Sequence, residues 1–291
     1  MTRRTIAEEV ACEGVALHAG TRVRARLLPS DSGNGIVFRR DDLGGVEIPA
    51  RYDHVTETRL GTVISENGAT IGVIEHLMAA VLGAGIDDLT VALDGPEPPI
   101  LDGDALSWFA LIDSAGIHER PGETRAVRIA KRVTVEDREA SVALSPAESL
   151  VFDFRIDFET AAIGAQELTW TFSREGFRRE IAPARTFGFV HELDALRRAG
   201  LANGASLANT LAIDGGGLRN PELRRFSDEF VRHKILDAIG DLALAGAPVI
   251  GRFEGRRSGH ALNNALLRAL FSDPGNYELD AGLDRGEGAM A

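Results

Sequence analysis

Two histidines and one aspartate in this sequence have the types and spacing of metal ligands. His233 and Asp237 are four residues apart in a segment of helical periodicity, so both side chains would lie on one helix face. His76 belongs to a second predicted helix, in the other half of the chain. Two histidines and a carboxylate can hold catalytic zinc and leave a fourth position open. The set His76, His233 and Asp237 is therefore our candidate metal site.

These residues also have simpler interpretations. His233, Asp237 and Asp241 could form a solvent-exposed stripe with an ion pair, and the stripe considered alone favours that interpretation. The strongly apolar flanks of the stripe argue for burial instead. His76 and the neighbouring Glu75 lie in an almost wholly apolar helix, where burial and polar partners are both expected. On spacing alone, two interpretations of His76 remain open: a core histidine whose hydrogen bonds are satisfied within the protein, and a ligand of a shared metal site.

Glu75 directly precedes a candidate ligand, so it could take the proton of an attacking water molecule. The pair Glu75 and His76 lacks the spacing of the zinc-protease motif HExxH, so the metal-binding helix of those proteases is excluded. The glycine run at residues 215–217 lacks GxGxxG spacing and a following helix, and a Walker lysine motif is absent from the sequence. The motifs therefore argue against dinucleotide binding and ATP chemistry.

The elements that must position these residues occur in the same order in both halves of the chain. Each half contains predicted strands, a helix, another strand, a loop and a second helix, which predicts two related α+β domains. The expected helices span residues 73–82, 105–114, 229–245 and 260–271. Gly83 and Gly85 are expected to end the first of these helices, and Asp104 is expected to cap the second. A strand is expected at residues 248–253 and a turn at residues 254–259. The predicted domains are residues 1–121 and 122–272, with an insert at about 188–219 and a loosely held acidic tail at 273–291.

Composition restricts the class of protein. The 291 residues are 44% hydrophobic and 26% charged, as in globular proteins. The net charge of −12 argues against a general binder of nucleic acid or anionic membranes, because phosphate affinity comes from lysine and arginine. Cys12 is the only cysteine, which excludes an intrachain disulfide and a cysteine-rich zinc module. Neither a secretory signal nor an apolar run of about 20 residues is visible, so we expect a soluble, cytoplasmic protein.

Six motifs, in chain order, resemble those of the UDP-3-O-acyl-N-acetylglucosamine deacetylases, the zinc enzymes of the committed step of lipid A synthesis in Gram-negative bacteria. The likeness runs from about Thr5 to Phe271. Two positions depart from the common family pattern: Asp104 replaces a frequent serine, and Ala208 replaces a residue that is often polar. The motifs are residues 14–20 (GVALHAG), 75–80 (EHLMAA), 94–103 (DGPEPPILDG), 184–189 (ARTFGF), 228–242 (DEFVRHKILDAIGDL) and 258–264 (SGHALNN).

The resemblance implies a fold, a metal and a set of catalytic residues. The helices of two two-layer α+β domains would pack together between two outer sheets. Zinc, or Fe²⁺ as an alternative in the cell, would be held by the three candidate ligands. Glu75 would be the general base, and His260 the charged partner and acid for the leaving amine. Asp241 would orient His260, and Thr186 would donate a hydrogen bond to the oxyanion.

The same resemblance implies a substrate and its contacts. Lys234 and Phe158 match positions on the nucleotide side of an acylated UDP-sugar, Phe187 lines the site, and His18 is a further candidate for substrate binding. The insert matches a family segment that forms an apolar passage for the acyl chain. We expect a monomer that does not bind nucleic acid and does not insert stably in a membrane.

Other function classes fit these residues less well. A catalytically inactive member, or a binding module with a structural metal, would need neither Glu75 nor His260, so these residues favour the enzyme. Dehydration of a hydroxyacyl thioester by a fused partner has weaker support, because an additional domain is not visible in the sequence. The expected activity is therefore metal-dependent N-deacetylation.

Overall fold

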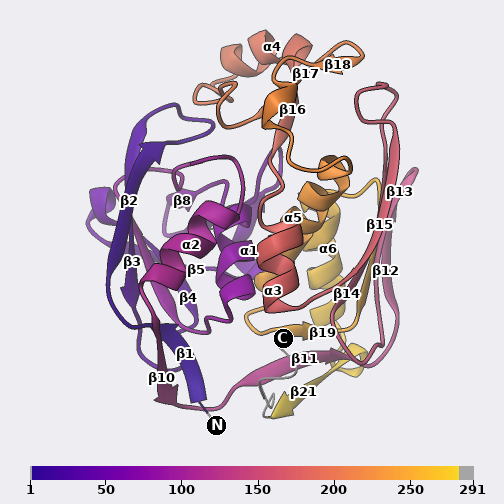
Figure 1. Ribbon diagram of the computed structural model, residues 1–291. Helices are drawn as coiled ribbons and strands as arrows, with labels where there is room; N and C mark the ends of the chain where they lie inside the picture. The colour runs from indigo at the N-terminus through magenta and orange to yellow at the C-terminus, as the bar shows by residue number, and fades with distance from the viewer. Residues whose placement is uncertain (1, 282–291) are drawn as a thin grey trace.

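Two five-stranded sheets form the outer layers of the molecule, and helices fill the space between them (Figure 1). The computed structural model describes residues 2–281. In the first sheet, β3 alternates buried Val23, Ala25 and Leu27 with exposed arginines, as a strand with one face on the core must. In sheet order the strands are β2 (Val10–Val15), β3 (Arg22–Pro29), β9 (Leu89–Leu93), β4 (Ile36–Arg40) and β5 (Val46–Pro49).

The second sheet repeats the strand order of the first. In both sheets the strand that comes last in the sequence lies at the centre. It runs antiparallel to the strand that comes second in the sequence and parallel to the strand that comes third. This shared crossover confirms the predicted α+β class and relates the two halves by topology. In sheet order the strands are β12 (Val133–Asp137), β13 (Ala140–Ser145), β20 (Arg252–Arg256), β14 (Val151–Asp157) and β15 (Ala165–Thr171).

Helices from both halves meet in the middle layer, where α1 packs closely on α5. A Cβ atom at Gly240 of α5 would lie 2.0 Å from the carbonyl oxygen of Glu75, so only glycine permits this approach. The contact places polar residues of α1 and α5 beside one another. The helices are α1 (Glu75–Ala84), α2 (Leu106–Ser114), α5 (Glu229–Ala243) and α6 (His260–Phe271), with the shorter α3 (Arg174–Gly176) and α4 (Leu193–Arg198).

Small sheets complete the molecule, and one of them belongs to the predicted insert. The insert rises beyond the helices at the top of Figure 1 and carries α4. Its three strands are β16 (Phe187–Phe189), β17 (Leu211–Asp214) and β18 (Gly217–Leu218). The others are β1 (Thr2–Ile6) with β10 (Ile117–Pro121), β6 (Val55–Glu57) with β7 (Val63–Glu66) and β8 (Ala69–Ile71), and β19 (Val249–Ile250) with β11 (Arg125–Ile129) and β21 (Tyr277–Ala281).

Several predicted boundaries need correction. Gly83 lies inside α1, where it makes room for Phe177, and the left-handed Gly85 alone ends the helix. The predicted turn at residues 254–259 is partly strand, because β20 pairs with two neighbours.

The segment that follows the second predicted domain also differs from the prediction. The predicted loose tail does not begin at 273, because β21 pairs with β11; residues 282–291 of that tail lie outside the described residues. The division between residues 121 and 122 stays a prediction.

Asp104 accepts a hydrogen bond from the backbone N–H of Ser107, 3.1 Å away, as expected of a residue that caps α2.

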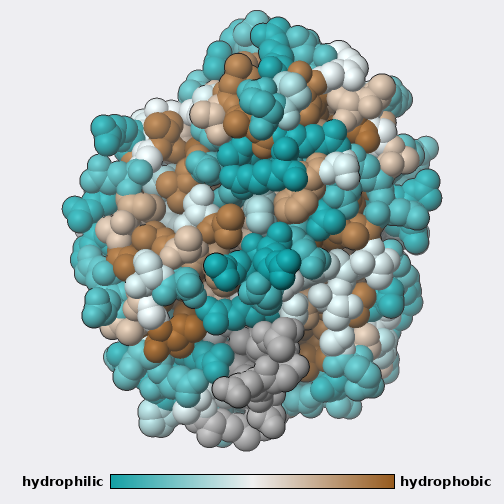
Figure 2. All heavy atoms as spheres, viewed as in Figure 1, coloured by the Kyte–Doolittle hydropathy of each residue, from teal (hydrophilic) through white to brown (hydrophobic). Residues whose placement is uncertain are grey.

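The interior is apolar and the visible surface is mixed. Large side chains such as Trp108, Phe152 and Phe230 are fully buried. Figure 2 shows hydrophilic residues over most of one face, interrupted by small separate hydrophobic patches. Within residues 2–281, none of the helices is both long and apolar enough to cross a bilayer.

Candidate metal and hydrolytic site

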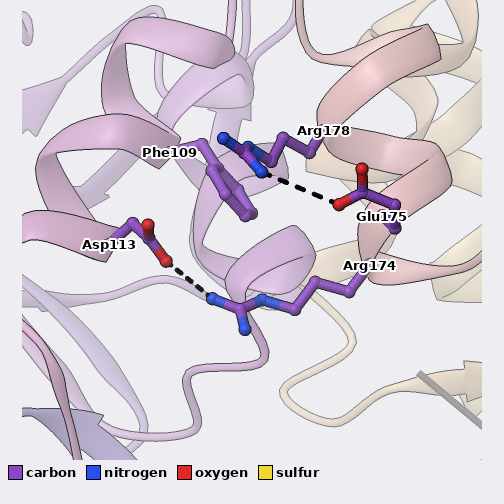
Figure 3. Close-up of a pocket in the computed structure, with 5 residues that line it drawn as sticks. All are labelled: Phe109, Asp113, Arg174, Glu175 and Arg178. Atoms are coloured by element: carbon purple, nitrogen blue, oxygen red, sulfur yellow. Dashed lines mark hydrogen bonds and ion pairs between the residues drawn. The ribbon is translucent and has the colours of Figure 1, made fainter. Parts of the chain in front are cut away.

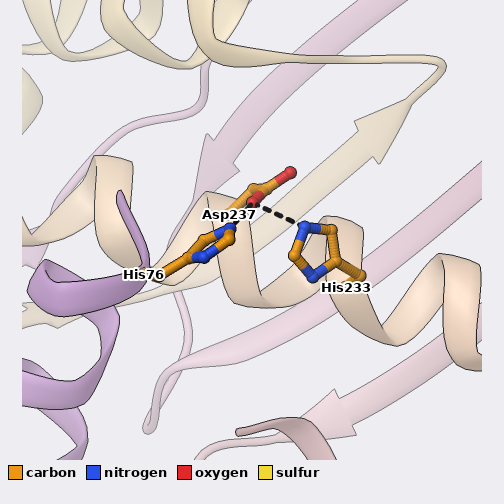
Figure 4. A group of neighbouring side chains, drawn as sticks. All are labelled: His76, His233 and Asp237. Atoms are coloured by element: carbon orange, nitrogen blue, oxygen red, sulfur yellow. Dashed lines mark ion pairs between the residues drawn. The ribbon is translucent and has the colours of Figure 1, made fainter. Parts of the chain in front are cut away.

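The structure brings His76, His233 and Asp237 together where α1 meets α5 (Figure 4). One ligand atom from each residue lies within 4.8 Å of the other two. All three residues are at most 4% exposed, so the solvent-exposed stripe considered for α5 is wrong. The apolar flanks of that stripe pack on the core and carry its polar residues inward with them.

The donor set fits a tetrahedral divalent ion. The Nε2 atoms of His76 and His233 lie 3.7 and 3.4 Å from Oδ1 of Asp237, too far for good hydrogen bonds. Ligands about 2.0–2.1 Å from a tetrahedral zinc ion are separated by about 3.3 Å, so the spacing is close to that of a ligand set. His233 Nδ1 faces the carbonyl oxygen of Ala184 at 3.1 Å, an arrangement that leaves Nε2 free to bind a metal.

The charges around the cluster favour metal binding at neutral pH. Burial and the neighbouring His233 lower the pKa of His76 to about 3, and burial lowers the pKa of His233 as well, so both rings are neutral. Burial alone would raise the pKa of Asp237, but the basic groups around it, including the hydrogen-bonded Lys234, lower that pKa and keep the carboxylate ionised. Neutral imidazoles and an ionised carboxylate are the forms that bind metal.

Glu75 and His260 face each other beside this cluster. His260 Nε2 lies 3.7 Å from Glu75 Oε1, and both residues are nearly buried. Burial raises the pKa of Glu75 to about 7, against the opposing charge of His260. Burial would lower the pKa of His260, but Asp241 and Glu75 raise it to about 10. The pair therefore offers a proton acceptor and a proton donor near neutral pH.

Asp241 is the polar centre behind His260. Its Oδ2 atom accepts hydrogen bonds from His260 Nδ1 at 2.9 Å and from Asn263 Nδ2 at 2.8 Å. Its Oδ1 atom accepts from the hydroxyl of Thr62 at 2.6 Å. These bonds direct the second ring nitrogen of His260 toward Glu75. His260 is the first residue of α6, and Gly259 precedes the helix.

Three of the predicted substrate-binding residues adjoin the cluster. Lys234 Nζ donates to Asp237 Oδ2 at 2.8 Å and lies 5.6 Å from the centre of the Phe187 ring. The Phe187 ring in turn lies against His233, with ring centres 6.1 Å apart, and against Phe158 at 5.8 Å. An aromatic wall with one cation therefore extends from the candidate ligands toward the insert.

Thr186 and His18 are held mainly by backbone contacts. The N–H of Thr186 donates to Gly103 O at 2.8 Å, and its carbonyl accepts from the N–H of Leu211 at 2.9 Å, which fixes it one residue before Phe187. His18 Nε2 lies 2.9 Å from Leu60 O, and His18 Nδ1 accepts from the N–H of Ala202 at 3.2 Å. Both ring nitrogens of His18 are thus engaged with the protein.

Thr62 and Glu97 are absent from the predicted site residues. Thr62 lies in a loop without a chemical motif, and Glu97 is one of three acids in the Pro/Gly loop of residues 94–103, so their types alone gave no signal. The structure shows Glu97 accepting the backbone N–H groups of His18 and Ala19 at 2.8 and 3.0 Å. Only the fold could reveal these long-range partners.

A separate hollow lies between α2 and α3 (Figure 3). Arg174 pairs with Asp113 at 2.9 Å and covers the Phe109 ring, while Arg178 approaches Glu175 at 3.8 Å. Each of these arginines already faces a carboxylate, and the lining residues do not include any of the predicted site residues. This hollow therefore offers no support for an anion site.

Comparisons with known proteins agree with this geometry. The family model of UDP-3-O-acyl N-acetylglycosamine deacetylase matches residues 3–272. The chain is 46% identical over 278 residues to the UDP-3-O-acyl-N-acetylglucosamine deacetylase of Myxococcus xanthus, covering 95% of this chain and 88% of that protein. It is 43% identical over 280 residues to that of Aliarcobacter butzleri (96% and 93% covered), and 46% identical over 277 residues to that of Phenylobacterium zucineum (94% of each). The chain therefore belongs to the UDP-3-O-acyl-N-acetylglucosamine deacetylase family.

Proposed function

We propose that this protein hydrolyses the N-acetyl group of UDP-3-O-(3-hydroxyacyl)-N-acetylglucosamine, releases acetate and acts in lipid A biosynthesis. The observation that carries the proposal is the buried set His76, His233 and Asp237 with Glu75 beside it. These three ligands would hold zinc, with Fe²⁺ as the alternative in the cell. A structural metal site would not need the adjacent acid–base pair of Glu75 and His260.

The reaction needs a nucleophile, a stabilised oxyanion and a proton for the amine. A divalent ion, when bound, polarises the acetamide carbonyl and makes water more acidic. Glu75 accepts a proton from the attacking water while the oxygen of that water bonds to the carbonyl carbon. His260 donates a proton to the nitrogen as the C–N bond breaks, and Asp241 holds that ring in place. Thr186 donates to the oxyanion, and acetate and a free amine leave.

The substrate is an acylated UDP-sugar, and neighbouring residues supply its contacts in this proposal. Lys234 and Phe158 meet the nucleotide side, Phe187 lines the site, and the insert forms the passage for the acyl chain. His18 is a further candidate for substrate binding, and its Nδ1 atom accepts a hydrogen bond from Ala202 of the insert. The protein acts in the cytoplasm as a monomer, without nucleic acid and without stable insertion in a membrane.

Acetate release from the acylated UDP-sugar tests the proposal. The zinc-loaded protein should release acetate, and Glu75→Gln should lower kcat by roughly 10²–10⁴, the usual contribution of a general base. Glutamine keeps an acceptor for the N–H of Thr62, so the fold and the metal content should not change. A parent protein that releases no acetate would refute the activity. A Glu75→Gln variant of normal kcat would remove Glu75 from the mechanism.

A further inference from the structure

Thr62 joins the two carboxylates that flank His260. Its backbone N–H donates to Glu75 Oε2 at 3.0 Å, and its hydroxyl donates to Asp241 Oδ1 at 2.6 Å. Thr62 is 1% exposed, so water does not compete for either hydrogen bond. A single residue thus fixes a carboxylate on α1 and a carboxylate on α5.

The loop that carries Thr62 is held by its surroundings. Leu60 and Gly61 both have positive φ, 61° and 152°, and a leucine rarely adopts such a conformation without support. His18 Nε2 supplies that support at Leu60 O, 2.9 Å away, because its Nδ1 accepts the N–H of Ala202 and its Nε2 is therefore the protonated nitrogen. The loop presents Thr62 to the site in one orientation.

Loss of the Thr62 hydroxyl would leave Asp241 Oδ1 buried without this donor. Asp241 is 2% exposed, and an unsatisfied buried carboxylate oxygen destabilises the arrangement that contains it. The carboxylate would turn toward other donors, and His260, bound to its Oδ2 atom, would turn with it. A small displacement of an acid or base is enough to slow proton transfer.

We propose that Thr62 is a positioning residue for the deacetylation reaction. It holds Glu75 and Asp241, and through Asp241 the ring of His260, in the geometry of proton transfer. This inference rests on the proposed function, since Glu75 and His260 move protons only in that reaction. It concerns the chemical step and not substrate affinity, because Thr62 is buried behind both carboxylates.

The test compares variants of Thr62 with a variant of another buried threonine. Thr62→Val keeps the shape and the N–H but removes the hydroxyl, and should lower kcat by about 10–100-fold while KM stays within about twofold. Thr62→Ser should restore most of kcat. Thr5→Val is the control: Thr5 on β1 is 1% exposed, and its hydroxyl accepts the N–H of Ser30 at 3.0 Å. It should lower the melting temperature without lowering kcat.

Metal content and melting temperature are measured for every variant. Equal kcat for Thr62→Val and Thr5→Val, or a raised KM at unchanged kcat, would overturn the inference. Thr62→Ala, which also lacks the hydroxyl, carries the same expectation if the valine variant does not fold. In an Asp241→Ala background, Thr62→Val should change kcat little, and a second full loss would contradict action through Asp241. Absence of acetate release by the parent would refute the proposed function instead.

Discussion

The buried carboxylates of the site are tolerated because each has charged or hydrogen-bonding partners. Glu75, Asp237 and Asp241 are at most 4% exposed, and an isolated carboxylate in such a place would be strongly unfavourable. Asp237 accepts from Lys234, and Asp241 accepts from three side-chain donors, including His260. Within residues 2–281, Glu75 has the N–H of Thr62 and a longer approach to His260 as its partners, which accords with the pKa that burial raises.

The pKa values of two residues predict a bell-shaped pH dependence of kcat/KM. Glu75 must be ionised to accept a proton, so activity should rise as pH increases through its raised pKa of about 7. His260 must be protonated to donate, so activity should fall as pH increases through its raised pKa of about 10. Asp241→Ala removes a negative charge that raises the pKa of His260, so the basic limb should move to lower pH.

Kinetics over pH 5–11 with the parent and Asp241→Ala measures both limbs. The limbs belong to a coupled pair, so the variants, and not the curve alone, assign them. His260→Ala is the companion variant and should lose the histidine component of the basic limb. A basic limb that coincides in the parent and Asp241→Ala would show that the pair of Asp241 and His260 does not set it.

Among the elements, the insert is tied to the first half of the molecule by hydrogen bonds to Leu17 and His18. The N–H of Ala202 donates to His18 Nδ1, and Gly204 N donates to Leu17 O at 2.9 Å. His18→Ala removes the acceptor for Ala202, so amides at residues 200–204 should exchange hydrogen about 2- to 10-fold faster, as loss of one hydrogen bond implies. His118→Ala, at an exposed histidine on β10, should leave this exchange unchanged. Identical exchange in the parent and His18→Ala would refute the tie.

How much the sequence predicts differs between helices and sheets. The apolar period of residues 229–245 and the glycine at 85 predict α5 and α1 within two residues, because local pattern and capping decide helices. The central position of β9 and β20 is not predictable in this way, since their pairing joins residues far apart in the chain. β20 also continues into a segment whose glycine and charges predict a turn.

The site follows the same division. The four-residue spacing of His233 and Asp237 predicts their place on one helix face, but spacing alone left their meeting with His76 open. Burial of the α5 stripe was suggested by its apolar flanks but not fixed by them, because it depends on the partner helix α1. Thr62 was beyond prediction, since it meets Asp241 across 179 residues of sequence.

At the scale of the whole molecule, the two halves meet to build one site. The first half supplies His76 and Glu75 from α1, and the second supplies His233 and Asp237 from α5 and His260 from α6. Gly240 permits the close contact that brings these groups together. Neither half alone contains a complete ligand set or a complete acid–base pair, so the proposed chemistry depends on the packing of both.

Titration of the metal-free protein with zinc, with acetate release as the readout, tests directly whether the reaction depends on the proposed metal site. Activity on the acylated UDP-sugar should be lost with a chelator, return with zinc and reach a plateau at about one ion per chain, as one three-residue ligand set implies. His76→Ala and Asp237→Ala should fail to reach that plateau, whereas His118→Ala should match the parent. Full acetate release by the metal-free protein would contradict a metal-dependent reaction, and an unchanged plateau in His76→Ala and Asp237→Ala would contradict the proposed ligand set.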